Sequence, residues 1–182
     1  MAVDTIPAYI NVDATSRAAF EERFRRLLDG HAPALARLAA SYTRSASDRD
    51  DLLQDIAMAV WKALPGFRGD CSERTFLFRI AHNRCLAFLS KRRITVPLDS
   101  EDTDQQDPAP TTEHQIWLEQ ERNRLVAAVQ RLPLIYRQAI TLTLEGLSYK
   151  ELAEVLGISE SNVGVRLNRA RTLLKTFLEE HS

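Results

Sequence analysis

The sequence predicts an all-α fold of two small helical domains joined by an acidic flexible linker. Apolar residues recur at the three- and four-residue spacing of amphipathic helices, and the N-terminal module shows no alternating strand pattern. The length of 182 residues and the 45% hydrophobic content suit one larger or two small globular domains. We predict a flexible tail over 1–15, a four-helix N-terminal module over 16–93, a linker over 94–113 and a helix-turn-helix module over 114–182.

The first predicted helix begins at Ser16 and is closed by Gly30, and Pro33 fits the first turn of a second helix. Ser47 or Asp48 caps a third, from about Asp50 to Leu64, where Pro65-Gly66 stops it. The fourth runs from Ser72 to Lys91. The expected buried face of the second helix is Leu35, Leu38, Ala39 and Tyr42, and the apolar positions of the third are Leu52, Leu53, Ile56, Val60 and Trp61.

The linker contains Pro97, Pro108 and Pro110 and lacks periodicity, as is typical of a disordered segment. Helix returns near Glu113, is broken by Pro133, and continues over Ile135–Leu144.

Residues 146–167 predict two short helices with a tight turn. Ser148 caps the first, Gly157 ends it in the left-handed conformation, and Ser159 caps the second. The expected buried stripe of the second helix is Val163, Leu167, Ala170 and Leu174. This pattern is typical of a helix-turn-helix, whose second helix enters the DNA major groove.

An ordinary helical hairpin is the alternative, and the charge distribution argues against it. Between Asn162 and Thr176 there is no acid, and the basic residues there are Arg166, Arg169, Arg171 and Lys175. Such unbalanced positive charge usually meets phosphates.

The net charge of −1 conceals segments of opposite sign. Residues 17–93 carry fifteen Lys and Arg against nine Asp and Glu, and residues 122–182 carry nine against six. Residues 94–121 carry eight acids and no base. Two basic modules separated by an acidic segment favour a nucleic-acid binder over a uniformly charged surface.

The remaining composition predicts a cytoplasmic protein with no membrane insertion, metal or cofactor. Cys71 and Cys85 form no CxxC motif, and no His is placed to complete a zinc site with them. We interpret the two cysteines as buried or incidental thiols in a reducing compartment. The N-terminus is not a signal peptide, since it carries acids and no apolar core, and no apolar run reaches membrane-spanning length.

Four acids cluster at the start of the third predicted helix: Asp48, Asp50, Asp51 and Asp55. Capping and dipole compensation account for part of this, but four acids exceed that need. We interpret them as a docking surface for a basic protein.

The fourth helix mixes arginines with aromatics. Phe76, Ile80 and Leu77 are expected in the core, while its basic residues define a cationic face. Such a face with stacking aromatics can hold a single strand, although helically spaced aromatics are more often core.

Four motifs, in this order, resemble the extracytoplasmic-function (ECF) sigma factors of the sigma-70 family. They are Asp48-Arg49-Asp50-Asp51-Leu52-Leu53-Gln54-Asp55, Leu64-Pro65-Gly66-Phe67-Arg68-Gly69, Thr75-Phe76-Leu77-Phe78-Arg79-Ile80-Ala81-His82-Asn83 and Gly146-Leu147-Ser148-Tyr149-Lys150-Glu151-Leu152-Ala153. The resemblance covers about 17–93 and 114–178. It implies a non-enzymatic factor that gives core RNA polymerase its promoter specificity and opens promoter DNA.

The resemblance also implies residue roles. Core polymerase, through its β′ coiled coil, is expected at Asp48, Asp51, Gln54, Asp55 and Trp61. The downstream promoter element, as melted single strand with a flipped base near Asn83, is expected at Arg74, Phe78, Arg79, His82, Asn83, Arg84, Arg92 and Arg93. The upstream element, as duplex, is expected at Ser159, Ser161, Asn162, Val165, Arg166 and Arg169. The C-terminal module is also expected to touch the polymerase β flap, and an anti-sigma factor is a possible partner.

The sequence departs from the family at two places. Phe76 stands where Trp is frequent and His82 where a basic residue is frequent. Gly164 and Val165 replace a common Lys-Ser pair, which removes a phosphate contact and lets the backbone approach DNA more closely.

The rival interpretation is a transcriptional regulator that binds duplex DNA without polymerase, which leaves the acidic cluster unexplained. An enzyme has little support, because the sequence has no phosphate loop, metal cluster or placed nucleophile and base.

Overall fold

The computed structural model describes residues 14–95 and 113–180, with side chains over 16–92 and 115–180. Every regular element within these ranges is a helix, which confirms the all-α prediction. The predicted tail and linker fall largely on residues 1–13 and 96–112, outside the described residues. No helix in the described part is both long and apolar enough to cross a membrane.

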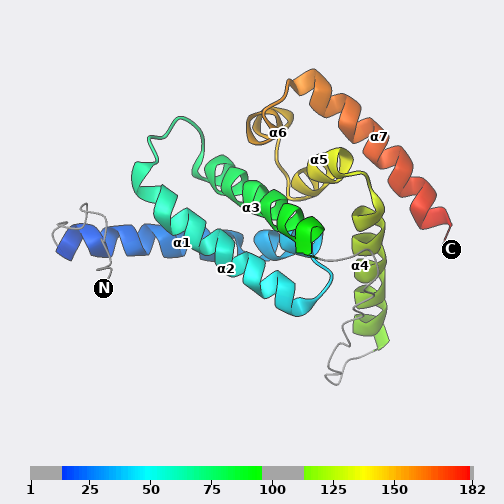
Figure 1. The fold of residues 1–182 in the computed structure, drawn as a ribbon, viewed down its shortest axis with the longest axis horizontal. Helices are drawn as coiled ribbons and strands as arrows, with labels where there is room; N and C mark the ends of the chain where they lie inside the picture. The colour runs from blue at the N-terminus through cyan, green and yellow to red at the C-terminus, as the bar shows by residue number, and fades with distance from the viewer. Residues whose placement is uncertain (1–13, 96–112, 181–182) are drawn as a thin grey trace.

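The N-terminal module consists of α1 (Ala14–Ala40), α2 (Ala46–Ala63), a single 3-10 turn (Leu64–Gly66) and α3 (Glu73–Thr95). The three helices pack on one another around a shared core (Figure 1). The most deeply buried side chains of this core are Leu38, Leu52, Ile56, Val60, Leu64, Leu77 and Phe78.

Helix α1 corrects the predicted break between Gly30 and Pro33. The chain stays helical from Ala14 to Ala40, with Pro33 inside the helix. Pro33 is exposed, so the carbonyl that loses its intrahelical partner can bind water, while Leu27 and Leu35 are buried on either side. Packing of both halves on one core therefore outweighs the local breaking signal.

The boundaries of the next two helices also differ from the prediction. The cap of α2 is Ser45, whose Oγ accepts a hydrogen bond from the backbone N–H of Asp48 at 3.1 Å. Helix α3 extends to Thr95, beyond the predicted end at Lys91.

The C-terminal module consists of α4 (Glu113–Arg131), α5 (Leu134–Leu144), α6 (Tyr149–Leu156) and α7 (Glu160–Glu179). Helix α7 packs along α5 and touches α4 and α6. The predicted stripe of α7 is confirmed, because Val163, Leu167 and Ala170 are fully buried and Leu174 is nearly so.

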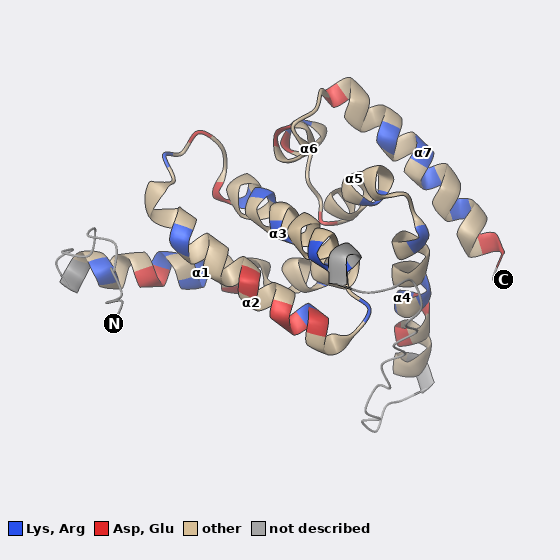
Figure 2. Cartoon of the chain, in the orientation of Figure 1, with Lys and Arg blue, Asp and Glu red and all other residues tan. Residues whose placement is uncertain are grey.

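The two modules are in direct contact. Helix α6 lies against α3, so the helix-turn-helix rests on the N-terminal module rather than standing apart from it (Figure 1). The acids gather at the start of α2, while basic residues follow α3 and α7 (Figure 2).

We predict opposite effects of alanine at two glycines. Gly157 has φ of 65°, so Gly157→Ala forces a left-handed alanine and should lower the free energy of unfolding by about 1–2 kcal/mol. Gly30 is exposed within α1, and a Cβ there would have no neighbour within 4 Å. Gly30→Ala should therefore raise the free energy of unfolding by about 0.5–1 kcal/mol. Urea unfolding of both variants measures the difference, and equal shifts would contradict the assigned turn.

Candidate nucleic-acid interface

The helix-turn-helix is held by caps at the start of α6, at its turn and at the start of α7. Ser148 and Glu151 form a capping box, in which the Ser148 Oγ accepts from the Glu151 N–H at 3.3 Å and the Ser148 N–H donates to Glu151 Oε2 at 2.8 Å. After the left-handed Gly157, the N–H of Ile158 donates back to the Ala153 carbonyl at 3.1 Å. At the start of α7, the Ser159 Oγ accepts from the Asn162 N–H at 3.3 Å, so the predicted caps at Ser148, Gly157 and Ser159 are confirmed.

The outward face of α7 carries the residues predicted to read duplex DNA. Ser159, Ser161, Asn162, Val165 and Arg169 are exposed, and Val165 is 55% exposed. Arg166 is half-buried, and its Nε donates to Asn162 Oδ1 at 3.1 Å, which aligns the two side chains one turn apart. Amide and guanidinium groups on one face are the common readers of base edges.

Gly164 lies on the side of α7 that is next to Tyr149 of α6. A Cβ at this position would lie 3.7 Å from a ring carbon of Tyr149 in α6, which is ordinary contact. A side chain at this position would therefore border α6, and the closer approach of the backbone to DNA stays a prediction.

Phe78 and His82 do not lie on the predicted DNA face of α3, and this prediction is corrected. Phe78 is fully buried and His82 is 4% exposed, because both belong to the stripe that also buries Leu77, Ala81 and Cys85. Burial lowers the pKa of His82 to about 4, so the ring is neutral near pH 7 and supplies no cationic charge.

Each arginine of the predicted downstream set whose side chain is described has a partner within the protein. An Arg79 Nη2 donates to the Cys71 sulfur at 3.4 Å, Arg84 lies 3.9 Å from Asp55, and Arg92 is ion-paired with Asp48. Arg74 points to the C-terminal module. Asn83 and Arg84 are exposed, and the side chain of Arg93 lies outside the described residues.

The outer face of α2 combines acids with apolar side chains. Asp51 and Gln54 are exposed, and Trp61 is 40% exposed with its ring edge-on to Phe20 and Phe24 at centroid distances of 4.6 and 4.9 Å. Met58, 49% exposed, was missed by sequence reasoning, although it lies four residues after Gln54 and three before Trp61. Asp48 and Asp55 are half-buried at the side facing α3.

This arrangement defines a two-module, all-helical DNA-binding protein with a separate face suited to another protein. Matches to sequence models of known families agree with it, since "Sigma-70 region 2" matches residues 27–94 and "Sigma-70, region 4" matches residues 122–174.

Relatives span nearly the whole chain. The RNA polymerase sigma factor NccH of Alcaligenes xylosoxydans xylosoxydans is 34% identical over 161 residues, covering 86% of this chain and 87% of the relative. The ECF RNA polymerase sigma factor SigM of Mycobacterium tuberculosis strain H37Rv is 33% identical, covering 91% of this chain and 80% of the relative.

Solved structures agree with the sequence relatives. CnrH in complex with the cytosolic domain of CnrY matches with a TM-score of 0.68 at 31% identity, covering 89% of this chain and 91% of that chain. Bartonella quintana RpoE in complex with the anti-sigma factor NepR matches with a TM-score of 0.66 at 25% identity, over 88% and 97%. The chain belongs to the ECF sigma factors of the sigma-70 family, and is an alternative sigma factor.

We predict that the buried His82 makes stability depend on pH. Its folded pKa lies below the unfolded value of about 6.5, so unfolding takes up a proton as the pH falls from 6.5 toward 4 and stability is lost over that window. Replacing His82 with Leu removes this loss. The difference between pH 7 and pH 5 should shrink by roughly 1–2 kcal/mol in the variant.

Chemical unfolding of wild type and variant at the two pH values tests this. Identical pH dependence in the two proteins would place His82 in solvent, as the sequence alone suggested.

Proposed function

We propose that this protein binds core RNA polymerase and directs it to promoters, opening the DNA at the downstream element. The observation that supports this most is the presence of two unlike surfaces on one chain. The outer face of α2 is acidic and apolar, which suits a basic protein partner, whereas α7 presents polar and basic side chains, which suit duplex DNA.

In this proposal the module over 16–93 acts at the polymerase and the melted strand, and the module over 114–182 acts at the upstream element. The β′ coiled coil contacts the expected residues Asp48, Asp51, Gln54, Asp55 and Trp61, and also Met58. The β flap contacts the C-terminal module. Around the exposed Asn83 and Arg84, α3 receives the unpaired strand and a flipped base.

We also propose control by an anti-sigma factor, in a response to stress or an envelope signal. The support is that CnrH and Bartonella quintana RpoE, in the two similar solved structures reported above, are each bound to another protein: the cytosolic domain of CnrY and the anti-sigma factor NepR. Run-off transcription with purified core polymerase on a genomic promoter library tests the function as a whole.

We predict that Asp51→Lys weakens assembly with core polymerase at least tenfold while the helical content is unchanged, because Asp51 is exposed on the proposed docking face. Asp29→Lys is the matched control, since Asp29 is exposed on α1 and the charge change is the same. Co-purification with core enzyme compares them. Equal binding of both variants would remove the α2 face from the proposal.

We predict that Arg166→Ala costs about 1–3 kcal/mol at the upstream element and relaxes preference at one base pair, as expected for a base-reading arginine. If Arg166 contacts a phosphate instead, Arg166→Ala should weaken binding to all DNA sequences alike and lower the slope of log affinity against log salt concentration by about one. Arg171→Ala is the control, because Arg171 is exposed on α7 but borders α4.

Titration of reconstituted holoenzyme against single-base-pair variants at two salt concentrations distinguishes these outcomes. No change in affinity or selectivity for Arg166→Ala would mean that α7 does not lie in the groove.

A further inference from the structure

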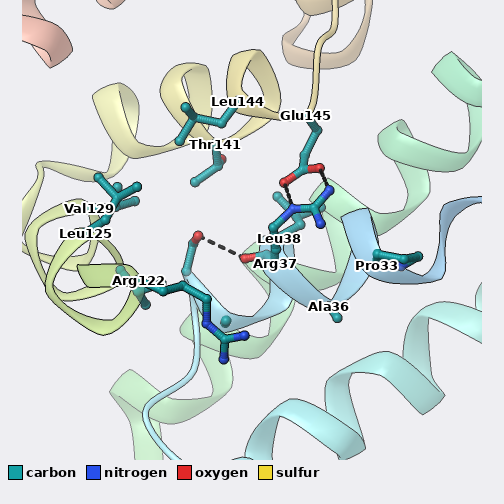
Figure 3. A pocket seen from close by; sticks show the side chains of 13 residues that line it. Pro33, Ala36, Arg37, Leu38, Arg122, Leu125, Val129, Thr141, Leu144 and Glu145 are labelled. Atoms are coloured by element: carbon teal, nitrogen blue, oxygen red, sulfur yellow. Dashed lines mark hydrogen bonds and ion pairs between the residues drawn. The ribbon is translucent and has the colours of Figure 1, made fainter. Parts of the chain in front are cut away.

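The two modules are joined by an ion pair at the end of α5. The Arg37 guanidinium in α1 grips both oxygens of Glu145, with Nε to Oε1 at 2.9 Å and Nη2 to Oε2 at 2.6 Å (Figure 3). The Glu145 side chain is only 5% exposed. Glu145 raises the pKa of Arg37 by hydrogen bonding. The carboxylate is thus enclosed and paired across the module boundary.

Arg74, at the start of α3, is bound at the same place. Its guanidinium donates to the backbone carbonyl of Glu145 and, at 3.3 Å, to that of Gly146, and lies 5.8 Å from the Phe78 ring centroid. These carbonyls follow the last turn of α5, where the helix dipole is negative. A cation predicted to meet nucleic acid is therefore held by backbone oxygens of the other module.

Two further contacts join the modules. Thr75, 1% exposed, donates its hydroxyl to Glu151 Oε1 at 3.4 Å. The Gln130 amide donates to the Ala40 and Thr43 carbonyls at 2.7 and 2.8 Å. The pKa of Glu151 is lowered mainly by its Ser148 hydrogen bonds and further by Arg74 and Thr75, so this carboxylate adds negative charge beside α3.

The contact combines these polar groups with apolar packing, and it is incompletely packed beside the Arg37–Glu145 pair, which suits a reversible contact. Beside the Arg37–Glu145 pair lies a cavity of about 540 Å³ between α1, α4 and α5, with apolar walls that include Leu125, Val129 and Leu144 (Figure 3). Leu125 and Leu144 are 39% and 56% exposed. Interfaces between domains of one chain resemble transient protein–protein interfaces, and they allow the domains to move relative to each other.

We propose that the C-terminal module competes with single-stranded DNA for the N-terminal end of α3. The carbonyls of Glu145 and Gly146 and the Glu151 carboxylate occupy the places where phosphate oxygens would bind Arg74. Arg37, which touches no proposed DNA residue, holds this closed state through Glu145. The inference rests on the proposed role of α3, and binding of a strand requires the modules to separate.

The test is charge reversal at Arg37 in the full chain. Arg37→Glu faces the enclosed Glu145 with a like charge and should open the contact, which raises the radius of gyration in small-angle X-ray scattering. Affinity for a fluorescent single-stranded oligodeoxynucleotide should rise about three- to tenfold, because apparent affinity follows the competent fraction. The charge change alone would weaken binding, so the gain has the opposite sign.

Three variants sharpen the test. Arg26→Glu makes the same charge change at an exposed position of α1 and should neither expand the chain nor tighten binding. Arg37→Glu with Glu145→Arg restores an opposite pair and should return both readouts to wild type. Arg74→Ala added to Arg37→Glu should abolish the gain in affinity.

Far-UV circular dichroism checks folding, and Glu145→Gln replaces Arg37→Glu if the latter does not fold. Unchanged dimensions would overturn the closed state. Expansion without tighter strand binding than Arg26→Glu would overturn the competition. Co-purification with core polymerase reports separately on the proposed function. If neither the wild type nor any variant co-purifies with core polymerase, the proposed function fails, whatever the scattering and strand-binding results.

Discussion

The structure depends on the burial of α3, which packs against α1, α2 and α6. One stripe, which includes Leu77, Phe78, Ala81 and Cys85, fills the core of the N-terminal module. A helix covered on several sides has little exposed surface, so its arginine side chains must lie at the edges of the contacts with the neighbouring helices. Each arginine of α3 whose side chain is described contacts a group outside the helix: Arg74 contacts the C-terminal module, Arg79 contacts Cys71, and Arg84 and Arg92 contact acids of α2.

The sequence was sufficient for the features set by local chemistry. Ser148, Gly157 and Ser159 act within one turn of their own position, and their caps are as expected. The buried stripe of α7 follows from spacing alone. The same reasoning failed at Pro33, because a proline on an exposed helical face costs one hydrogen bond that water can replace, while burial of Leu27, Leu35 and Leu38 on a common core favours one continuous helix.

The errors in α3 have a different cause. Arginines and aromatics alternate so closely along this helix that composition does not reveal which side faces inward, and His82 looks cationic until its burial is known. The contact of Arg74 with the Glu145 and Gly146 carbonyls was beyond sequence reasoning, because its acceptors are backbone atoms more than seventy positions away. Every residue has a backbone carbonyl, so the charge pattern of a sequence does not show which carbonyl an arginine will bind.

The acidic face of α2 and the basic face of α3 are not independent surfaces. Asp48 pairs with Arg92, and Asp55 lies near Arg84, with every side chain in these pairs partly exposed. Ion pairs at this exposure contribute at most about 1 kcal/mol each, so a basic protein partner can displace them at small cost. Within the proposed function, polymerase binding at Asp48 and Asp55 therefore releases two arginines beside the strand that the polymerase must hold open. In this proposal, charge that is neutralised by Asp48 and Asp55 in the free protein becomes available to DNA once the protein partner has bound.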